Sequence, residues 1–257
     1  MNEMSKPASH ADTVQQLRVD LACALRWAAR MGMNEGVDNH FSAAVPEPDG
    51  SIKGDKFLIN PFGWHWSEIT ASSLVLCDVD GTVLEGSETV EATAFCIHSR
   101  IHINHPNAAV VLHTHQPYAT ALTLLEGGRL EMVEQNALMF DDRIAYDDDY
   151  EGLALATEEG DRMAAQMDGK PILMLASHGV MVSGPTVADA FNDLYYLERA
   201  CMFQVHAKST GGTLRRIGDN VRARVKGQME TERKAVADRH FTALRRMLDR
   251  EEPGYRA

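Results

Sequence analysis

The stretch VVLHTHQP, residues 110–117, places two histidines one residue apart at the end of an apolar run. This run predicts a buried strand, because it is short, apolar and rich in β-branched residues. Side chains alternate between the two faces of a strand, so His113 and His115 project to the same side. Two imidazoles that a strand holds together suit a transition metal. The pair alone is weak evidence, since a surface role at the end of the strand fits it too.

A third histidine strengthens the metal interpretation. His178 lies in ILMLASHGVMV, residues 172–182, where a second apolar run ends just before a turn glycine. Three histidines that leave a coordination position open are typical of a catalytic metal site, whereas structural zinc sites are closed by four protein ligands. The sequence therefore predicts a metal centre at the ends of two buried strands.

A second histidine pair occurs in HSRIH, residues 98–102. The spacing of four residues places His98 and His102 on one face of a helix, and such a pair can bind a metal. The general-base glutamate that follows the first histidine of an HExxH site is absent here. We therefore favour a structural role for this pair.

The composition excludes several classes of protein. The chain has 257 residues, of which 44% are apolar and 24% are charged, and it has no apolar stretch of roughly the 18 residues that span a bilayer. We expect no membrane insertion. The polar N-terminus favours a cytoplasmic protein. The net charge of −12 disfavours nucleic acid as a partner. Four scattered cysteines without a CxxC pair indicate buried free thiols.

Helical and strand patterns alternate along the chain and predict an α/β domain. Apolar spacing predicts helices over 11–32, 90–104 and from 186 onward, and residues 72–86 predict a hairpin with its turn at Asp80 and Gly81. Residues 211–257 carry 12 basic and 7 acidic side chains, against 13 and 30 in residues 1–210. We expect a polar arm over 1–14, a domain over 15–210 and a basic helical tail over 211–257. This tail could dock on the acidic body, within one chain or between chains.

An ordered set of short motifs runs through the domain: NHFS at 39–42, INPFG at 59–63, DGTVLEG at 80–86, AFCIHSRIH at 94–102, VVLHTH at 110–115 and SHGVMVSGPTVADAFNDLYYLERA at 177–200. The set resembles the class II aldolase/adducin family, the group around L-fuculose-phosphate aldolase. The resemblance implies a three-layer α/β/α domain around a central, largely antiparallel sheet, here with a C-terminal helical extension. It also implies a divalent metal on His113, His115 and His178, most often Zn²⁺, with Mn²⁺ or Co²⁺ as alternatives.

The sequence departs from the sugar-phosphate aldolases of this family at three places. Alignment on the histidines puts Ala94 where those aldolases carry their glutamate. Their phosphate-binding Gly-Asn pair corresponds to Asn39 and His40, and their Thr-Pro-Ser-Gly turn corresponds to residues 60–63. We therefore expect a divergent member whose substrate carries no phosphate. By position, the candidate substrate-binding residues are His40, Asn60 and Gly63.

The acid/base group has to lie elsewhere if Ala94 replaces the aldolase glutamate. Related dehydratases of the superfamily carry a catalytic glutamate downstream of the histidine pair, and Glu134 in EMVEQNALMF lies in that region. A carboxylate near a metal suits general acid/base work, although a solvated loop glutamate fits the same pattern. Weaker candidates are Tyr146, Tyr150 and Tyr255, the last from a neighbouring subunit.

The resemblance implies a metal-dependent lyase. It would cleave a C–C bond next to a carbonyl or hydroxy-carbonyl of a small molecule, by retro-aldol cleavage or decarboxylation, through a metal-stabilised enolate. The substrate would be a non-phosphorylated hydroxy or aromatic acid. The alternative is a non-catalytic interaction module like the adducin head, which predicts an eroded histidine triad. Members of the family commonly form homotetramers, and we expect one here.

Overall fold

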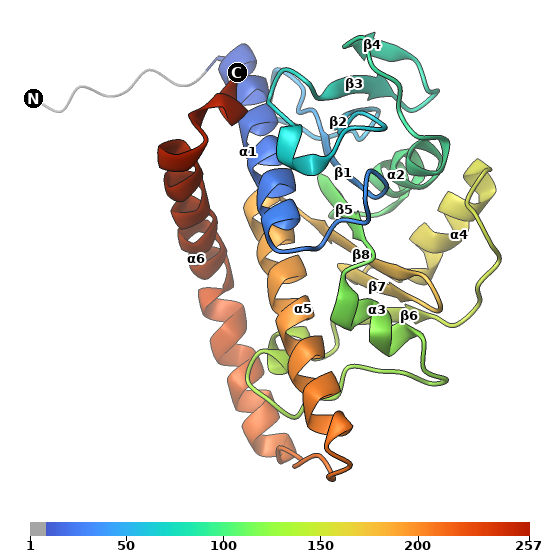
Figure 1. The fold of residues 1–257 in the computed structure, drawn as a ribbon, viewed down its shortest axis with the longest axis vertical. Helices are drawn as coiled ribbons and strands as arrows, with labels where there is room; N and C mark the ends of the chain where they lie inside the picture. Colours follow the sequence, from blue (N-terminus) through green and yellow to red (C-terminus); the bar gives the residue numbers. More distant parts are fainter. Residues whose placement is uncertain (1–8) are drawn as a thin grey trace, which may run out of the picture.

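A single sheet of eight strands forms the centre of the computed structural model, which describes residues 9–257 (Figure 1). The strands follow one another across the sheet in the order β4-β3-β2-β1-β5-β8-β7-β6. Every neighbouring pair is antiparallel except β6 and β7, which are parallel. The strands are β1 (His40–Ala44), β2 (Lys56–Ile59), β3 (Val75–Asp78), β4 (Val83–Glu85), β5 (Val110–Thr114), β6 (Ile144–Asp147), β7 (Ile172–Leu175) and β8 (Gly179–Gly184). The prediction of a largely antiparallel sheet is confirmed.

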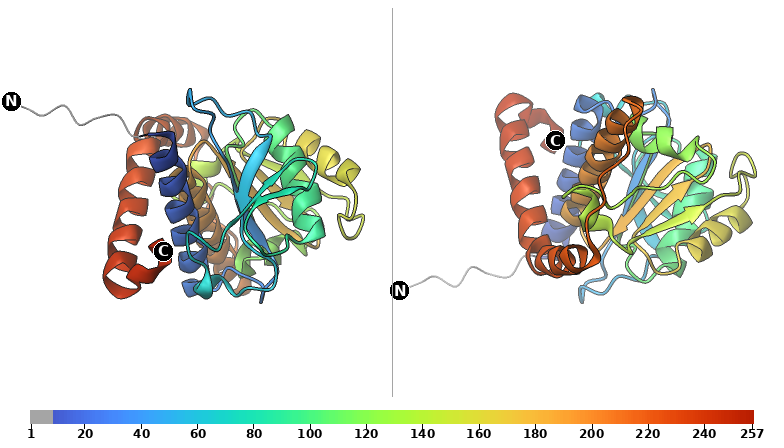
Figure 2. Two further views of the ribbon diagram at one scale, coloured as in Figure 1. Left: turned by 90° about the horizontal axis from the view of Figure 1, so that it is seen from above. Right: turned by 90° about the horizontal axis from the view of Figure 1, so that it is seen from below.

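Helices cover both faces of this sheet (Figure 2). Helices α2 (Ala92–Asn104) and α4 (Thr157–Gln166) lie on one face, and α1 (His10–Arg30) and α5 (Val187–Ser209) lie on the other. The short α3 (Pro117–Thr123) packs beside α5, and the long α6 (Asp219–Glu251) lies outside α1 and α5 as an additional layer. The described residues also form three single-turn helices: η1 (Trp66–Glu68), η2 (Ala137–Phe140) and η3 (Pro253–Arg256). The three-layer domain and its C-terminal helix are therefore confirmed.

Local sequence explains where several of these elements begin and turn. Ser9 and Asp12 form a capping box that starts α1, so the helix begins inside the segment predicted as a polar arm, and residues 1–8 of that arm lie outside the described residues. Thr186 caps α5. Gly81 forms the predicted hairpin turn with a φ of 87°. Within residues 9–257, no helix is long and apolar enough to cross a bilayer. All four cysteines are buried and free, as predicted.

The alternation of side chains along the central strands builds two separate cores. On β5, Val110 and Leu112 pack into the core formed with α1 and α5, whereas Val111 packs into the core formed with α2 and α4. His113 is two residues after Val111 on the same strand, so it faces the same side of the sheet, toward α2 and α4. On β1, which pairs with β5, His40 is opposite His113 and therefore faces the same side. The sheet thus directs histidines from adjacent strands toward α2.

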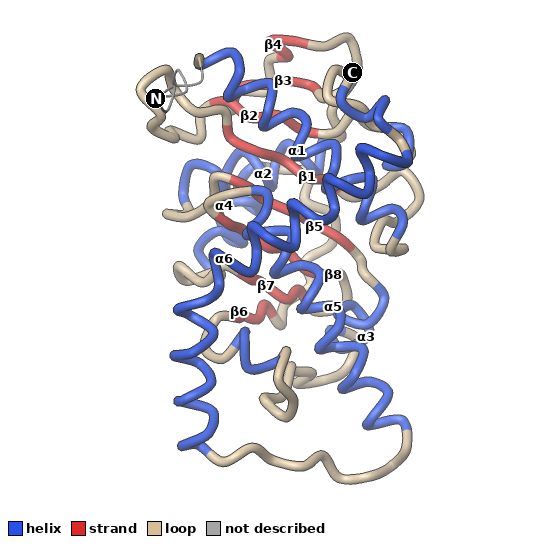
Figure 3. The backbone as a smooth tube through the Cα atoms, turned by 90° about the vertical axis from the view of Figure 1, so that its left-hand side faces the viewer, coloured by secondary structure: helices blue, strands red, loops and turns tan. Residues whose placement is uncertain are grey.

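The basic C-terminal helix docks on the body of its own chain (Figure 3). Phe241, Leu244 and Leu248 of α6 are buried in the core shared with α1 and α5. Around this apolar stripe, Arg222 pairs with Asp141 at 2.8 Å and Arg245 pairs with Asp20 at 2.9 Å, while Arg143 and Arg233 both pair with Asp193. The charge imbalance in the sequence therefore corresponds to an intrachain interface.

We expect Asp193→Ala to destabilise the protein by about 3 kcal/mol. The Asp193 side chain is 3% exposed, and its removal leaves the guanidinium groups of Arg143 and Arg233 without their shared carboxylate. Urea unfolding followed by circular dichroism measures the change. The matched control is Asp238→Ala, which removes a half-exposed i,i+4 pair with Lys234 and should cost less than about 0.5 kcal/mol. Equal effects from the two variants would show that the buried cluster does not stabilise the docked helix.

Candidate metal centre

Three histidine rings meet at the end of β5. His113 is the fourth residue of β5, His115 lies just beyond this strand, and His178 lies in the tight turn between β7 and β8. The ring centroids are 5.1 Å apart for His113 and His115, and 4.9 Å apart for each of the other two pairs. One nitrogen from each ring lies within 4.8 Å of the others. The structure brings together all three residues predicted as ligands.

Hydrogen bonding around the triad fits a divalent metal. Nδ1 of His113 lies 3.0 Å from the carbonyl of Val180, which can only accept, so this nitrogen donates and leaves Nε2 with its lone pair. Nε2 of His115 is buried and has no hydrogen-bond partner among the described residues. A buried imidazole nitrogen without a partner is rare in proteins. A transition metal would satisfy both nitrogens.

Burial keeps the triad in the form that binds metals. Loss of hydration lowers the pKa of His113 well below 6.5, and the nearby His178 and His40 lower it further. Burial likewise lowers the pKa of His178 to about 4, and a proton on this ring would also be repelled by one on the neighbouring His115. Burial also lowers the pKa of His115. The three imidazoles are therefore neutral at pH 7, as metal ligation requires.

Gly179 permits the close approach of the turn that carries His178. A Cβ atom at this position would lie 2.5 Å from the carbonyl oxygen of Thr114 and 2.8 Å from Cδ2 of His115. The backbone oxygen cannot swing away, because Thr114 is paired with β8. Only glycine lets the β7–β8 turn contact the end of β5, and this contact places His178 against the other two histidines.

We expect Gly179→Ala to weaken metal binding by roughly ten- to a hundredfold, a loss of the size seen when the support of a metal ligand is removed. Competition for zinc with a coloured chelator measures it. The overpacked turn should also cost about 1–3 kcal/mol of stability. Gly227→Ala is the matched control, because nothing lies within 4 Å of a Cβ built in this helical position. It should leave zinc affinity unchanged and slightly raise stability. Wild-type affinity in Gly179→Ala would contradict the steric argument.

The triad forms part of the wall of a cavity of about 450 Å³. His40, whose ring lies against that of His113, and Glu91 also line this cavity, together with the exposed side chains of Tyr150 and Leu153. Nε2 of His40 lies 3.4 Å from a carboxylate oxygen of Glu91. The site therefore combines three neutral imidazoles with a fourth imidazole and the carboxylates of Glu91 and Asp38.

Glu91 lies at the candidate site, although the sequence did not indicate it as a candidate residue. Ala94, at the aligned position of the aldolase glutamate, is buried and carries no acid, as expected. A glutamate nevertheless faces the histidines, because Glu91 reaches the cavity from the N-cap of α2, three residues before Ala94. One feature of the sequence could have indicated Glu91. It is seven residues before His98, which places both side chains on one face of a helix that spans them.

The structure distributes the other candidates differently from the prediction. His40 lines the cavity. Asn60 lies behind the wall, where its side chain accepts from the backbone of Phe41 at 2.9 Å and supports the turn at residue 39. Gly63 has a φ of 82° in the turn after β2 and does not line the cavity. Asn60 is therefore a scaffold residue and Gly63 a turn residue in this chain.

The acid/base candidates also separate. The carboxylate of Glu134 accepts from the backbone of Asn136 and Ala137, so it caps η2 and does not line the histidine cavity. Tyr255 is buried in its own chain, with its hydroxyl donating to Asp249 at 2.8 Å. Tyr150 does reach the cavity rim, with its ring centroid 6.3 Å from that of His178. Among the glutamates of residues 9–257, Glu91 is thus the one that lines the histidine cavity.

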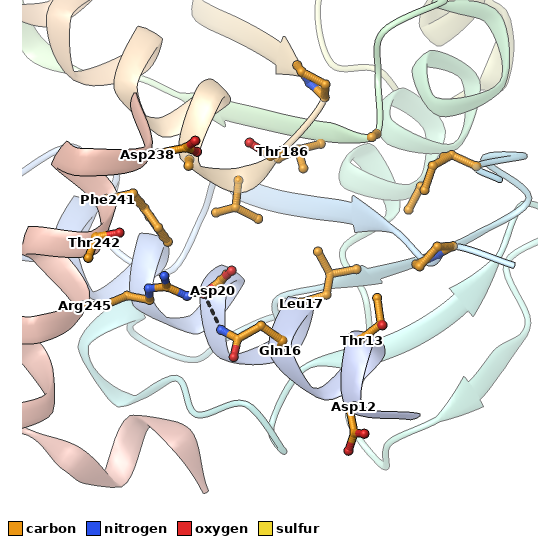
Figure 4. A pocket seen from close by; sticks show the side chains of 18 residues that line it. Asp12, Thr13, Gln16, Leu17, Asp20, Thr186, Asp238, Phe241, Thr242 and Arg245 are labelled. Atoms are coloured by element: carbon orange, nitrogen blue, oxygen red, sulfur yellow. Dashed lines mark hydrogen bonds and ion pairs between the residues drawn. The ribbon is translucent and has the colours of Figure 1, made fainter. Parts of the chain in front are cut away.

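A larger hollow of about 690 Å³ lies at the opposite end of β5, between α1 and α6 (Figure 4). Asp20 and Arg245 in its wall are already paired with each other, and Gln16 donates to Asp20 at 2.8 Å. Among residues 9–257, only the triad at the other end of the strand brings three possible metal ligands together. Size alone does not make the larger hollow the reactive site.

Comparison with known proteins agrees with this fold. Residues 19–205 match the sequence profile described as the Class II Aldolase and Adducin N-terminal domain. The chain belongs to the class II aldolase and adducin family. A solved aldolase II superfamily protein from Pseudomonas syringae is 35% identical to it, with a TM-score of 0.87 over 99% of this chain and 98% of that one.

Two relatives show how widely the functions of this family differ. A Streptomyces roseochromogenus protein named 4-hydroxy-3-prenylphenylpyruvate oxygenase/4-hydroxy-3-prenylbenzoate synthase is 32% identical over 79% of this chain and 72% of its own length. Human beta-adducin is 34% identical over 77% of this chain, but this region is 29% of its length. Family membership therefore establishes the fold, whereas the reaction has to be inferred from the side chains that line the cavity.

Proposed function

We propose that this protein is a divalent-metal-dependent lyase that cleaves a C–C bond next to a carbonyl or hydroxy-carbonyl, by retro-aldol cleavage or decarboxylation. The observation that supports this most is the joint presence of the neutral histidine triad, Glu91 and His40 around one cavity. A non-catalytic module needs no such set, since buried imidazoles without partners reduce stability unless they bind something. Zn²⁺ is our first choice of metal.

The protein side chains divide the work as follows. A divalent metal on the triad supplies Lewis acidity that draws electrons from a substrate carbonyl. Contact with His40 and a hydrogen bond from Thr93 lower the pKa of Glu91 to about 2, so this group is an ionised carboxylate at neutral pH and can accept a proton. In retro-aldol cleavage Glu91 removes the hydroxyl proton, the broken bond leaves its electron pair on the substrate carbonyl, and an aldehyde departs. The same proton is then available to the remaining carbon.

The cavity wall favours a substrate without phosphate. Among residues 9–257, no lysine or arginine lines this cavity, and the helix N-terminus that reaches it, that of α2, carries the carboxylate of Glu91, which repels a phosphate. The rim residues Tyr150 and Leu153 offer an apolar surface that suits an aromatic ring. A relative is named for an aromatic pyruvate. We therefore place hydroxy acids and aromatic 2-oxo acids first among substrates.

The proposal is tested by turnover. Metal-stripped protein is reloaded with zinc, manganese, cobalt or ferrous iron and incubated with hydroxy acids, aromatic 2-oxo acids and, for comparison, L-fuculose 1-phosphate. Release of aldehyde or carbon dioxide from a non-phosphorylated acid would support the lyase. Consumption of oxygen with ferrous iron alone would assign the site to oxygenase chemistry instead. Loaded protein that turns over none of these compounds would favour the adducin-like module.

We also propose that the chain assembles as a homotetramer. Leu124, Leu125, Leu153 and Leu155 are between 55% and 75% exposed, and Leu153 and Leu155 lie on the loop at the cavity rim. Exposed apolar side chains in this number are typical of an interface with another protein surface. Light scattering coupled to size-exclusion chromatography should give about four times the chain mass of 28.4 kDa. A monomer at micromolar concentration would contradict the assembly.

A further inference from the structure

A continuous chain of hydrogen bonds runs from the cavity wall into the core beneath it. Nδ1 of His40 lies 2.7 Å from Nε2 of His98, and Nδ1 of His98 lies 2.5 Å from the hydroxyl of Ser42. The same hydroxyl lies 2.7 Å from Nε2 of His102, whose Nδ1 lies 2.6 Å from the carbonyl oxygen of Ala108. The three histidines and Ser42 are all buried. The proposed mechanism does not yet use His98, Ser42 or His102.

The spacing of these residues explains how the chain forms. His40 and Ser42 are two residues apart on β1 and point to the same face, toward α2. His98 and His102 are four residues apart on α2 and point to one face of the helix, toward β1. Packing the helix on the strand interleaves the four side chains. The HSRIH pair, for which the sequence favours a structural role, therefore lies directly behind the metal centre.

The hydrogen bond to the Ala108 carbonyl fixes which nitrogen or oxygen carries the proton in every other bond of this series. A carbonyl oxygen only accepts, so Nδ1 of His102 carries the proton and Nε2 accepts from Ser42. A hydroxyl has a single proton, so Ser42 must in turn accept from Nδ1 of His98. Nε2 of His98 then accepts from Nδ1 of His40. This order requires His98 and His102 to be neutral, and burial lowers the pKa of both, that of His102 to about 4.

His40 is the residue of this hydrogen-bond series that lines the cavity. Its Nδ1 is committed to His98, so Nε2 is the nitrogen that faces Glu91 at 3.4 Å. Its ring also lies against the ring of His113, with centroids 5.0 Å apart and an angle of 27° between the planes. A His40 ring without a proton on Nδ1 would set the lone pairs of this nitrogen and of His98 Nε2 against each other and lose the hydrogen bond.

We propose that Ser42, His98 and His102 are positioning residues that keep Nδ1 of His40 protonated and bonded to His98, and so direct its Nε2 to proton exchange with Glu91. This inference deepens the proposed function, because it assigns the orientation of a group at the same cavity. The hydrogen-bond order itself exists whether or not the protein is a lyase. Its test can therefore be made without turnover.

The test is histidine tautomer analysis by NMR of ¹⁵N-histidine-labelled protein, metal-free and zinc-loaded. Long-range ¹H–¹⁵N correlation distinguishes a ring protonated on Nδ1 from one protonated on Nε2, and His→Gln variants assign the signals. We expect His98 and His102 each to be a single Nδ1-protonated tautomer in the wild type, and His40 to carry a proton on Nδ1. In Ser42→Ala, His98 loses its acceptor, so the single tautomer of His98 and the fixed Nδ1 proton of His40 should be lost, whereas His102 keeps its bond to Ala108.

The matched control is Ser99→Ala. Ser99 is a buried serine next to His98, and its hydroxyl has no hydrogen-bond partner among the described residues. This variant should leave all three tautomers unchanged, and circular dichroism checks that both variants fold. A His40 or His98 that lacks a proton on Nδ1 in the wild type overturns the inference without any variant. An unaltered His40 tautomer in folded Ser42→Ala would also overturn it. Failure of the lyase assay with the expected tautomers would instead count against the proposed function alone.

Discussion

Replacement of His113 by alanine should reduce bound zinc from about one ion per chain to less than a tenth of that. His113 contributes one of three imidazoles, and its ring is held in place by the Val180 carbonyl on a paired strand. Two remaining ligands from a turn and a strand end hold a divalent ion much more weakly. Turnover should fall at least about a thousandfold, because the Lewis acid supplies several kcal/mol of stabilisation to the transition state. Metal analysis of dialysed protein and steady-state kinetics measure the two effects.

His105→Ala is the matched control for this variant. His105 is also a buried histidine, but its Nε2 contacts the carbonyl of Lys170, away from the triad. We expect it to lose some stability and to keep its zinc. His115→Ala provides a second test, because His115 is less buried than His113 and its removal disturbs the core less. Unchanged zinc content in both His113→Ala and His115→Ala would show that the metal binds elsewhere.

The parts of the site that the sequence predicts are those that depend on local pattern. His113 and His115 share a face because strand side chains alternate, and His178 follows an apolar run whose strand lies in the same sheet. These relations need only the identity of each element. The basic tail is a partial success, because its charge predicts docking but does not distinguish its own chain from a neighbour. The partners Asp193, Asp141 and Asp20 are distant in sequence and become known only from the fold.

The parts that the sequence does not predict depend on where an element begins relative to another. Glu91 reaches the cavity because α2 starts directly after it, and alignment on His98 cannot reveal this offset. Asn60 faces the backbone of β1 and not the cavity, although it is adjacent in sequence to a predicted turn. The hydrogen-bond chain from His40 to Ala108 requires the packing of α2 on β1. Such features follow from tertiary packing, which overrides the local pattern.

Glu91 and Glu134 are the two glutamates considered for the acid/base role, and their glutamine variants distinguish between them. We expect Glu91→Gln to lower kcat by about a hundred- to ten-thousandfold, the range that a positioned acid or base contributes, with zinc content unchanged because Glu91 is outside the triad. The amide has nearly the same size but cannot take up a proton at neutral pH. Glu134→Gln should leave kcat within about twofold and lower stability slightly, since it weakens the cap of η2.

Steady-state kinetics on zinc-loaded variants, with metal content measured on the same samples, compares the two changes directly. A large loss of kcat in Glu134→Gln with little loss in Glu91→Gln would reverse the assignment. It would also imply that Glu134 acts from a neighbouring subunit, because within one chain its carboxylate is held by the backbone of Asn136 and Ala137. A decarboxylase predicts a third pattern, in which Glu91→Gln slows product protonation and leaves carbon dioxide release less affected, since loss of carbon dioxide needs no base. In Glu91→Gln, the slowing of product protonation relative to the slowing of carbon dioxide release therefore distinguishes decarboxylation from retro-aldol cleavage. The comparison of kcat between Glu91→Gln and Glu134→Gln identifies the glutamate.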